Sequence, residues 1–189
     1  MRRRWRGLRR LAAVLAFSVA AFARAEPEVS RENRYKAACL YNFAQFVEWP
    51  ASAFADASAP IEIGIFGENP FGDVLQEIVR GQTIRGRRIE VKQSDKMDDL
   101  KSCQVLFMAK TEKARVNEFM AGAKDGPALT VSGMDGFIAR GGMINFFLKD
   151  GKVRFEINNE AAKRYGLKIS SQILSLGKRV ETAREPEPK

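Results

Sequence analysis

Apolar residues near the start of the chain recur at the spacing of one helix face. The residues at i, i+3, i+4 and i+7 are Leu40, Phe43, Ala44 and Val47. This period is typical of an amphipathic helix with one buried side. Ser30 suits the N-cap position and Pro50 ends the run, so we expect a helix from Ser30 to about Val47. Tyr41 and Phe46 lie outside the apolar stripe, which indicates an element that is packed on more than one side.

Short apolar runs alternate with helical segments through the middle of the chain. We expect strands at residues 61–66, 89–91, 105–109 and 128–131, and helices from residue 69 and over residues 111–123. Asn69 is the expected N-cap of the first of these helices, with Pro70 at its first position. Strands that alternate with helices predict an α/β fold, a single domain with a mixed sheet and helices packed on its faces, as in a Rossmann-like sandwich.

The turn from Gly67 to Pro70 lies between a strand and a helix, where nucleotide-binding proteins carry a glycine-rich loop. The glycine spacing here is only a bare G-x-x-G, which is a weak signal. Glu68 would also place a carboxylate where the phosphates should bind. Nucleotide binding is therefore the weaker interpretation of this turn.

Asp150-Gly151 stands between the runs MINFFLK and KVRFEIN and predicts a C-terminal β-hairpin with a two-residue primed turn. The turn sets the register, and the face that we expect to be buried consists of Ile144, Phe146, Leu148, Val153, Phe155 and Ile157. The opposite face carries Asn145, Arg154 and Glu156. These three polar residues form either a satisfied cross-strand cluster or part of a partner-binding surface.

Two apolar features are further candidates for partner binding. The segment from Ser132 to Gly142 holds four glycines around Phe137 and Ile138. These two side chains either form the apolar tips of an adaptable loop or fold back onto the domain. Trp49, at the end of the first helix, either closes the core or lines a groove for a partner or an apolar ligand.

The two ends of the chain are expected to lie outside the folded domain. Residues 1–10 hold six arginines, a mostly apolar stretch follows, and Ala23-Arg24-Ala25 fits a cleavage site, so residues 1–25 resemble a secretory signal peptide. The apolar stretch is shorter than the roughly 20 residues that span a bilayer, which disfavours an uncleaved anchor. The domain then covers residues 26–180, and residues 181–189 form a charged tail that we expect to be disordered. We expect the exported protein to be soluble in the periplasm.

Removal of the signal changes the electrostatic argument. The chain carries 32 Lys and Arg against 23 Asp and Glu, a net charge of +9, but seven of the arginines lie in residues 1–25. The remainder is close to neutral, and Arg80 to Arg88 is too short a basic stretch to indicate a nucleic-acid surface. The chain has no histidine, which excludes His-dependent triads and most zinc chemistry. We therefore expect neither a cofactor nor a catalytic site.

Cys39 and Cys103 are the two cysteines of the chain, and each has apolar neighbours in the sequence. In an oxidising compartment they either pair in a disulfide or remain two separate buried thiols. Two cysteines are too few for a cysteine-rich metal site.

Several segments together resemble the YfiR family. They are KAACLYNFAQFVEWP, FGENPFGDVL, CQVLFMA, LTVSGMDGFIARGGMINFFLKDGKVRFEIN and LKISSQILSL, which span about Lys36 to Leu176. The resemblance implies a periplasmic α/β protein, without catalytic residues, that restrains an inner-membrane diguanylate cyclase and so tunes cyclic di-GMP and biofilm behaviour. The best-studied members use two cysteine pairs. Here Cys103 falls where one family cysteine does, and Cys39 has no obvious counterpart.

The function that these observations favour is a periplasmic, non-enzymatic regulatory protein. It would bind the periplasmic part of an inner-membrane diguanylate cyclase or sensor kinase, and a homodimer stays open. The alternative is a periplasmic protein that binds a small ligand or an envelope component. An enzyme would have to rely on carboxylates or lysines alone, and no pair of them stands out from solvated surface charge.

Overall fold

The computed structural model describes residues 29–180, so the expected signal peptide and the expected tail lie outside the described residues. Eight strands form the main sheet of this part. Their order is β3 (Thr83–Ile84), β4 (Arg87–Ser94), β2 (Ile61–Phe66), β5 (Val105–Met108), β6 (Leu129–Ser132), β7 (Ile144–Lys149), β8 (Lys152–Ile157) and β10 (Lys178–Arg179). Strands β4, β2, β5, β6 and β7 run parallel, whereas β3 and β8 are antiparallel to their neighbours β4 and β7. The prediction of an α/β fold with a mixed sheet is confirmed.

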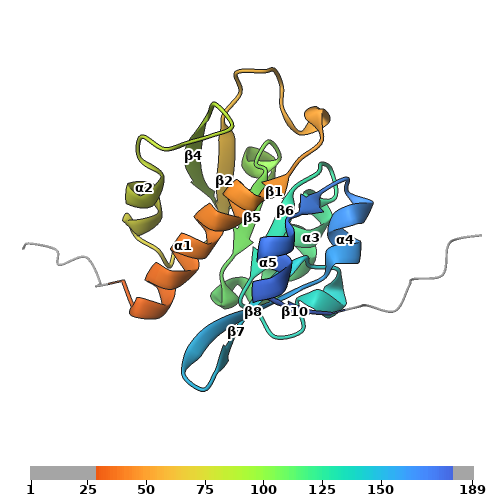
Figure 1. The fold of residues 1–189 in the computed structure, drawn as a ribbon. Coiled ribbons are helices and arrows are strands. Elements are labelled where there is room, and N and C mark those ends of the chain that lie inside the picture. Colours follow the sequence, from red (N-terminus) through yellow and green to blue (C-terminus); the bar gives the residue numbers. More distant parts are fainter. Residues whose placement is uncertain (1–28, 181–189) are drawn as a thin grey trace, which may run out of the picture.

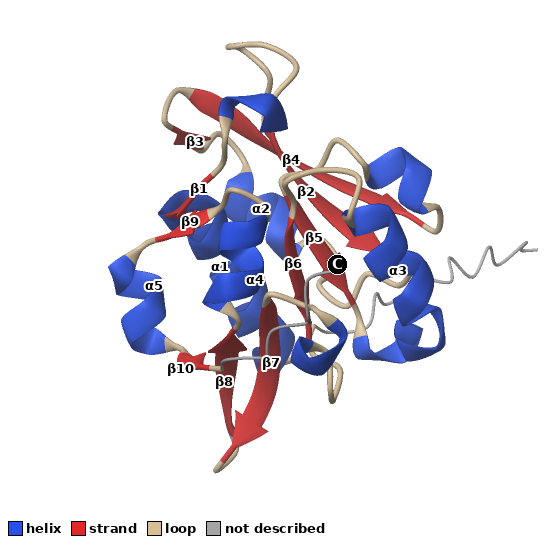
Figure 2. Ribbon diagram, turned by 90° about the vertical axis from the view of Figure 1, so that its right-hand side faces the viewer, coloured by secondary structure: helices blue, strands red, loops and turns tan. Residues whose placement is uncertain are grey.

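Helices cover both faces of the sheet (Figures 1 and 2). One face carries α1 (Arg31–Phe46), α2 (Val74–Val79), α4 (Asn159–Arg164) and α5 (Ser171–Leu176). The other face carries α3 (Val116–Ala123) and the 3₁₀ turn η2 (Met97–Leu100), and their buried side chains form a second core cluster. A two-stranded antiparallel sheet of β1 (Val47–Glu48) and β9 (Lys168–Ile169) joins the end of α1 to the segment before α5.

Helix α1 has the boundaries and the buried face that the sequence predicts. Its N-cap is Ser30, whose hydroxyl accepts a hydrogen bond from the Asn33 backbone N–H at 3.2 Å. The predicted stripe is at most 1% exposed and consists of Leu40, Phe43, Ala44 and Val47. Tyr41 and Phe46 are partly buried against the same core cluster, so the helix is enclosed on more than one side.

The predicted start of the next helix is wrong. Asn69 does not cap a helix: its side-chain oxygen accepts a hydrogen bond from the Phe71 N–H at 2.9 Å, and its amide donates to the Gly72 carbonyl at 3.1 Å. These bonds close a tight turn, because an Asn side chain can replace a backbone acceptor two residues before the donor. Helix α2 therefore begins only at Val74. The helix predicted from Thr111 likewise begins later, because residues 110–115 form the 3₁₀ turn η3 (Lys110–Arg115).

The glycine-rich segment after β6 is a crossover connection. Strands β6 and β7 pair in parallel, so residues 133–143 must return along the sheet and cover one of its faces. Phe137 is therefore fully buried, and its ring lies 6.1 Å from that of Phe119 of α3. Gly142 allows this packing, because a Cβ there would lie 2.3 Å from the Phe137 ring. Ile138 is also buried, so the expectation that Phe137 and Ile138 form exposed tips is wrong, and their alternative role in the core holds.

Candidate functional site

The hairpin of β7 and β8 projects from the end of the molecule (Figure 1). Strand β6 pairs with β7 only as far as Asn145, and β10 pairs with β8 only from Glu156. The hairpin strands between these two points have no neighbouring strand outside the hairpin within the described part of the chain. The outer half of the hairpin therefore extends past the other strands of the sheet.

The geometry of the hairpin follows from its turn. Asp150 and Gly151 have φ values of 52° and 67°, which is the left-handed pair that a type I′ turn requires. The predicted register is confirmed, with Phe146 opposite Phe155 and Asn145 opposite Glu156. The turn thus fixes which side chains share a face.

Only part of the predicted buried face is buried. Phe146 and Phe155 pack on Phe43 of α1, with ring centroids 5.9 and 5.2 Å away. Leu148, two residues closer to the tip, is 58% exposed, and Val153 opposite it is partly exposed. The prediction that Leu148 is buried is wrong, because the outer half of the hairpin lies beyond the helices that cover the inner half.

Two further exposed apolar side chains lie on helices next to the hairpin, on α1, which contacts β8, and on α5, which contacts β10. Tyr35, on the first turns of α1, is 50% exposed, and Leu176, at the end of α5, is 71% exposed. Gly177, next to Leu176, packs so closely on Phe155 that a Cβ would lie 2.7 Å from the ring. We define the hairpin surface as the exposed outer half of the hairpin with its surroundings: the apolar members Tyr35, Leu148, Val153 and Leu176, and, on the opposite face of the strands, the cations Lys149, Lys152 and Arg154.

The hairpin surface is positively charged. Residues 149–154 hold three cations and one carboxylate, Asp150. Lys149, Lys152 and Arg154 are exposed, and none of them makes an ion pair with a described residue. Lys178 and Arg179 of the adjoining β10 are exposed as well. Exposed apolar side chains on one face, with cations that make no ion pair within residues 29–180 on the other, are typical of a surface that binds another molecule.

The three polar candidates on the opposite face have different environments. Asn145 is 4% exposed and donates to the Glu156 carboxylate at 3.3 Å, whereas Arg154 is exposed. The side-chain oxygen of Asn145 is buried and has no hydrogen-bond partner among residues 29–180. The positive charge of Arg154 acts on Tyr35 of α1, although the pKa of Tyr35 is raised overall, chiefly by Cys39. The structure therefore joins Asn145 to Glu156, and it leaves Arg154 exposed further along the same face, opposite Leu148 and Val153.

Trp49 lies at the other end of α1, away from the hairpin. Its ring is partly buried against the first core cluster, and its Nε1 donates a hydrogen bond to the Gln104 carbonyl at 3.0 Å. The Gln104 side chain is itself fully engaged with the backbones of Ala53, Glu62 and Ser102. These contacts favour the interpretation of Trp49 as the residue that closes the core.

A cavity of about 430 Å³ lies next to this end of the sheet. It is lined by Phe54, Pro60, Lys101, Ser102 and Pro127 among others, and by the buried Cys103. The Glu62 carboxylate at its wall is already engaged by the Ser102 hydroxyl at 2.5 Å and by Lys92 at 2.6 Å. The volume suits a small molecule, since ligand sites commonly measure 300–1,000 Å³.

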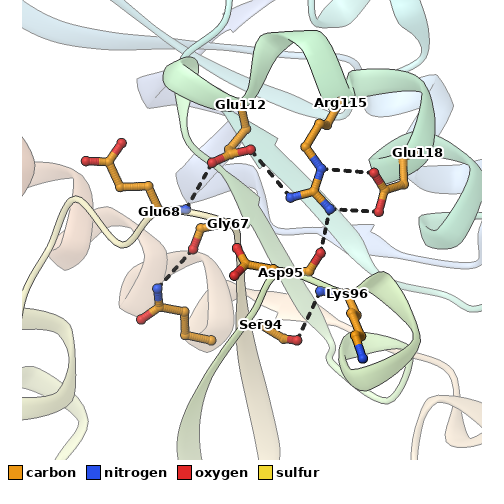
Figure 3. Close-up of polar contacts among 9 residues, drawn as sticks. Gly67, Glu68, Ser94, Asp95, Lys96, Glu112, Arg115 and Glu118 are labelled. Carbon is orange, nitrogen blue, oxygen red and sulfur yellow. Dashed lines mark hydrogen bonds and ion pairs between the residues drawn. The ribbon is translucent and has the colours of Figure 1, made fainter.

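Strand β2 lies between β4 and β5, so the strand order reverses at β2. Open α/β sheets usually bind ligands at the carboxyl ends of the strands at such a switch point, which here is formed by the loops after β2 and β5. Figure 3 shows that Glu112 fills this place: its carboxylate accepts a hydrogen bond from the Glu68 N–H at 3.2 Å. Arg115 lies 3.6 Å from Glu112, binds Glu118 with two hydrogen bonds and stacks on Phe66. The chain's own carboxylate thus already binds a backbone N–H of this turn and would repel a phosphate there, which argues against nucleotide binding.

Glu112 was not among the residues that the sequence singled out. The sequence gives little indication of the role of Glu112, because that role depends on its close contact with Gly67. A Cβ on Gly67 would lie 2.4 Å from the Glu112 carboxyl carbon. Contacts of this kind join segments far apart in sequence and leave no local pattern.

Comparison with known protein families identifies the family of this chain. Residues 33–178 match the family described as YfiR/HmsC-like. The chain belongs to the YfiR/HmsC-like family. No curated protein matches the sequence. One solved structure that it resembles is a conserved domain protein from Vibrio cholerae O1 biovar eltor, with 12% identity and a TM-score of 0.49; the similarity covers 78% of this chain and 59% of that one.

The two cysteines of this YfiR/HmsC-like protein are free thiols. Cys39 belongs to the core cluster under α1, and Cys103 to the cluster on the opposite face of the sheet. The structure therefore contains the two separate buried thiols, not the disulfide. Burial raises the pKa of Cys39 to about 11 and that of Cys103 to about 12. Thiols of this kind are poor nucleophiles near neutral pH.

Two further properties of the family member concern residues 29–180. No helix there is long and apolar enough to cross a membrane. No group of three or more Cys, Asp or Glu side chains in this part could hold a metal ion.

Proposed function

We infer that this protein is a periplasmic regulatory protein that restrains an inner-membrane diguanylate cyclase, and thereby cyclic di-GMP signalling, by direct binding. Membership of the YfiR/HmsC-like family over residues 33–178 carries the proposal. Regulation by binding requires an accessible surface and no catalytic group, and the hairpin surface is an accessible surface of the right kind. The expected signal peptide at residues 1–25 supports the periplasmic location.

The proposal predicts a specific genetic result. Deletion of the gene should raise cellular cyclic di-GMP, and expression of the full chain with its leader should restore the original level. Expression without residues 1–25 should not restore it, because the protein would remain in the cytoplasm. Unchanged cyclic di-GMP after deletion, in a strain that makes the protein, would refute the proposal.

Direct binding needs a second measurement. The purified chain should bind the purified periplasmic part of a co-transcribed membrane cyclase in isothermal titration calorimetry. A cyclase that responds to the deletion but does not bind the protein would show that the effect is indirect.

The cavity beside Cys103 favours the alternative function, a periplasmic protein that binds a small ligand. Its volume of about 430 Å³ is the observation behind it. Native mass spectrometry of protein purified from the periplasm should then show a bound mass. Ala55→Trp places a large ring at this exposed wall and should remove the bound mass without lowering the melting temperature.

A further inference from the structure

The outer half of the hairpin combines three features that are rarely left open in a sheet protein. Its strand edges face no other strand of residues 29–180, one of its faces exposes Leu148 and leaves Val153 partly exposed, and the cations at its tip make no ion pair within those residues. Proteins normally cover or blunt such edges, because an open edge is a template for another strand. Each feature thus indicates that something binds here.

The register shows which backbone groups are available. Asn158 N–H donates to the Met143 carbonyl inside the hairpin, and Val180 N–H donates to the Ile157 carbonyl from outside it. In an antiparallel pair, inward and outward residues alternate, so the odd-numbered residues of β8 point their N–H and C=O groups outward. Val153 is such a residue, and β10 begins to pair only at Glu156. The outward N–H and C=O of Val153 therefore face no described strand.

The charges indicate what could bind there. Lys149, Lys152 and Arg154 lie on the face of the outer half opposite Leu148 and Val153, and Asp150 is the only carboxylate among residues 149–154. A second copy of the chain, docked through the same surface, would bring like charges together and is disfavoured. A membrane is disfavoured as well, because lipid tails would leave the outward N–H and C=O of Val153 unpaired, whereas a polypeptide strand pairs both groups.

We propose that the hairpin surface binds an acidic, extended segment of a protein partner, which adds as a strand beside β8 and places apolar side chains against Leu148 and Val153. Main-chain hydrogen bonds to Val153 provide the docking, as in other cases of strand addition. The cations at the tip select a segment with carboxylates. The inference rests on the proposed function in one respect, that a regulatory protein must bind a partner. It does not require that partner to be a cyclase.

Site-specific photo-crosslinking in living cells tests the proposal. A photoreactive p-benzoylphenylalanine is introduced at Leu148, and at Thr83 of β3 as the matched control on the opposite edge of the sheet, where the side chain is also exposed. We expect the residue 148 probe to crosslink a protein through an acidic peptide, and the residue 83 probe not to crosslink that peptide. The double reversal K149E/K152E should lower the crosslink about tenfold, and reciprocal Glu→Lys changes in the captured peptide should restore it.

A second variant isolates the backbone contact. Val153→Pro removes an outward N–H and leaves the hydrogen bonds between β7 and β8 in place, so the melting temperature should stay close to that of the wild type while the crosslink is lost. Melting curves of all variants show whether each one is folded. A Val153→Pro variant that is folded and still crosslinks at the wild-type level overturns strand addition.

The other outcomes are equally decisive. A crosslink to lipid, to a second copy of the chain or to a peptide without carboxylates overturns the proposal, as does the absence of any crosslink from residue 148. Co-sedimentation with phosphatidylglycerol vesicles that K149E/K152E abolishes would identify a membrane as the ligand and overturn it too. An acidic partner that is not a cyclase would leave this inference standing and refute the proposed function.

Discussion

Trp49 donates the hydrogen bond of its indole Nε1 to the carbonyl oxygen of Gln104, 3.0 Å away and 55 residues further along the chain. The bond joins the end of α1 to the residue just before β5. The side chain of Gln104 continues the connection, because it accepts from the Glu62 N–H at 2.8 Å and donates to the Ala53 carbonyl at 2.7 Å. One tryptophan and one glutamine thus hold three segments together at this end of the sheet.

Trp49→Ala should lower the free energy of unfolding by about 2–4 kcal/mol, because it removes a partly buried ring and leaves the Gln104 carbonyl without its donor. Trp49→Phe is the matched control: it keeps most of the ring and loses only the hydrogen bond, so it should cost about 1 kcal/mol. Urea unfolding measures both. An alanine variant as stable as the wild type would instead indicate a ring that serves a partner.

Gly67→Ala should destabilise the protein through a contact with Glu112. Gly67 has a φ of 77°, and an added Cβ would lie 2.4 Å from the Glu112 carboxyl carbon. Gly86 has a similar φ of 80° and open space around it, so Gly86→Ala carries only the backbone cost of roughly 1 kcal/mol. We expect Gly67→Ala to cost at least about 1 kcal/mol more than Gly86→Ala in urea unfolding.

A double variant identifies the cause of that difference. Gly67→Ala combined with Glu112→Ala should cost less than the sum of the two single changes, because the second substitution removes the atoms that clash. Strictly additive costs would show that Glu112 does not limit residue 67.

Local signals made two parts of the fold predictable. Helix α1 follows from the apolar stripe with Ser30 as its cap, and the hairpin register follows from Asp150-Gly151 alone. Both depend on interactions between residues close in sequence. The exposure of Leu148 was not predictable in this way, because it depends on how far the helices that cover Phe146 and Phe155 reach along the hairpin.

The remaining differences between prediction and structure arise from contacts that a local sequence pattern does not show. Phe137 looks like the tip of a flexible loop in the sequence, but the parallel pairing of β6 with β7 turns that loop into a covering layer. Asn69 resembles a helix cap, but its hydrogen bonds close a separate turn. Neither the cavity beside Cys103 nor the position of Glu112 has a local sequence signature.

The buried thiols should make stability fall at high pH. Burial raises the pKa of Cys39 to about 11 and of Cys103 to about 12, from 9.0 when exposed. The folded protein therefore holds these protons more tightly, so the stabilisation is complete below pH 9 and is lost as the pH rises toward 11 and 12. Between pH 8.5 and 10 the loss should be roughly 1 kcal/mol per thiol.

Urea unfolding at several pH values measures this dependence, and the double variant C39A/C103A is the control. Its stability should fall less steeply with pH than that of the wild type, even though the two substitutions lower the stability at neutral pH. Equal slopes would show that other groups cause the decline. Iodoacetamide at pH 8 should label neither thiol in the folded protein and both in urea.

Asn145 provides the last test, because it carries a buried polar atom that the fold does not use. Its Oδ1 has no hydrogen-bond partner in the described part of the chain, while its amide donates to Glu156, which is partly exposed and can bind water instead. Asn145→Leu preserves the approximate volume, removes the unsatisfied oxygen and should change the free energy of unfolding by less than about 1 kcal/mol. Asn145→Asp should cost about 2 kcal/mol or more, because it places a second carboxylate beside Glu156 in a buried position. If Asn145→Leu instead costs more than about 2 kcal/mol in urea unfolding, then the oxygen is satisfied in solution and its partner is part of the fold.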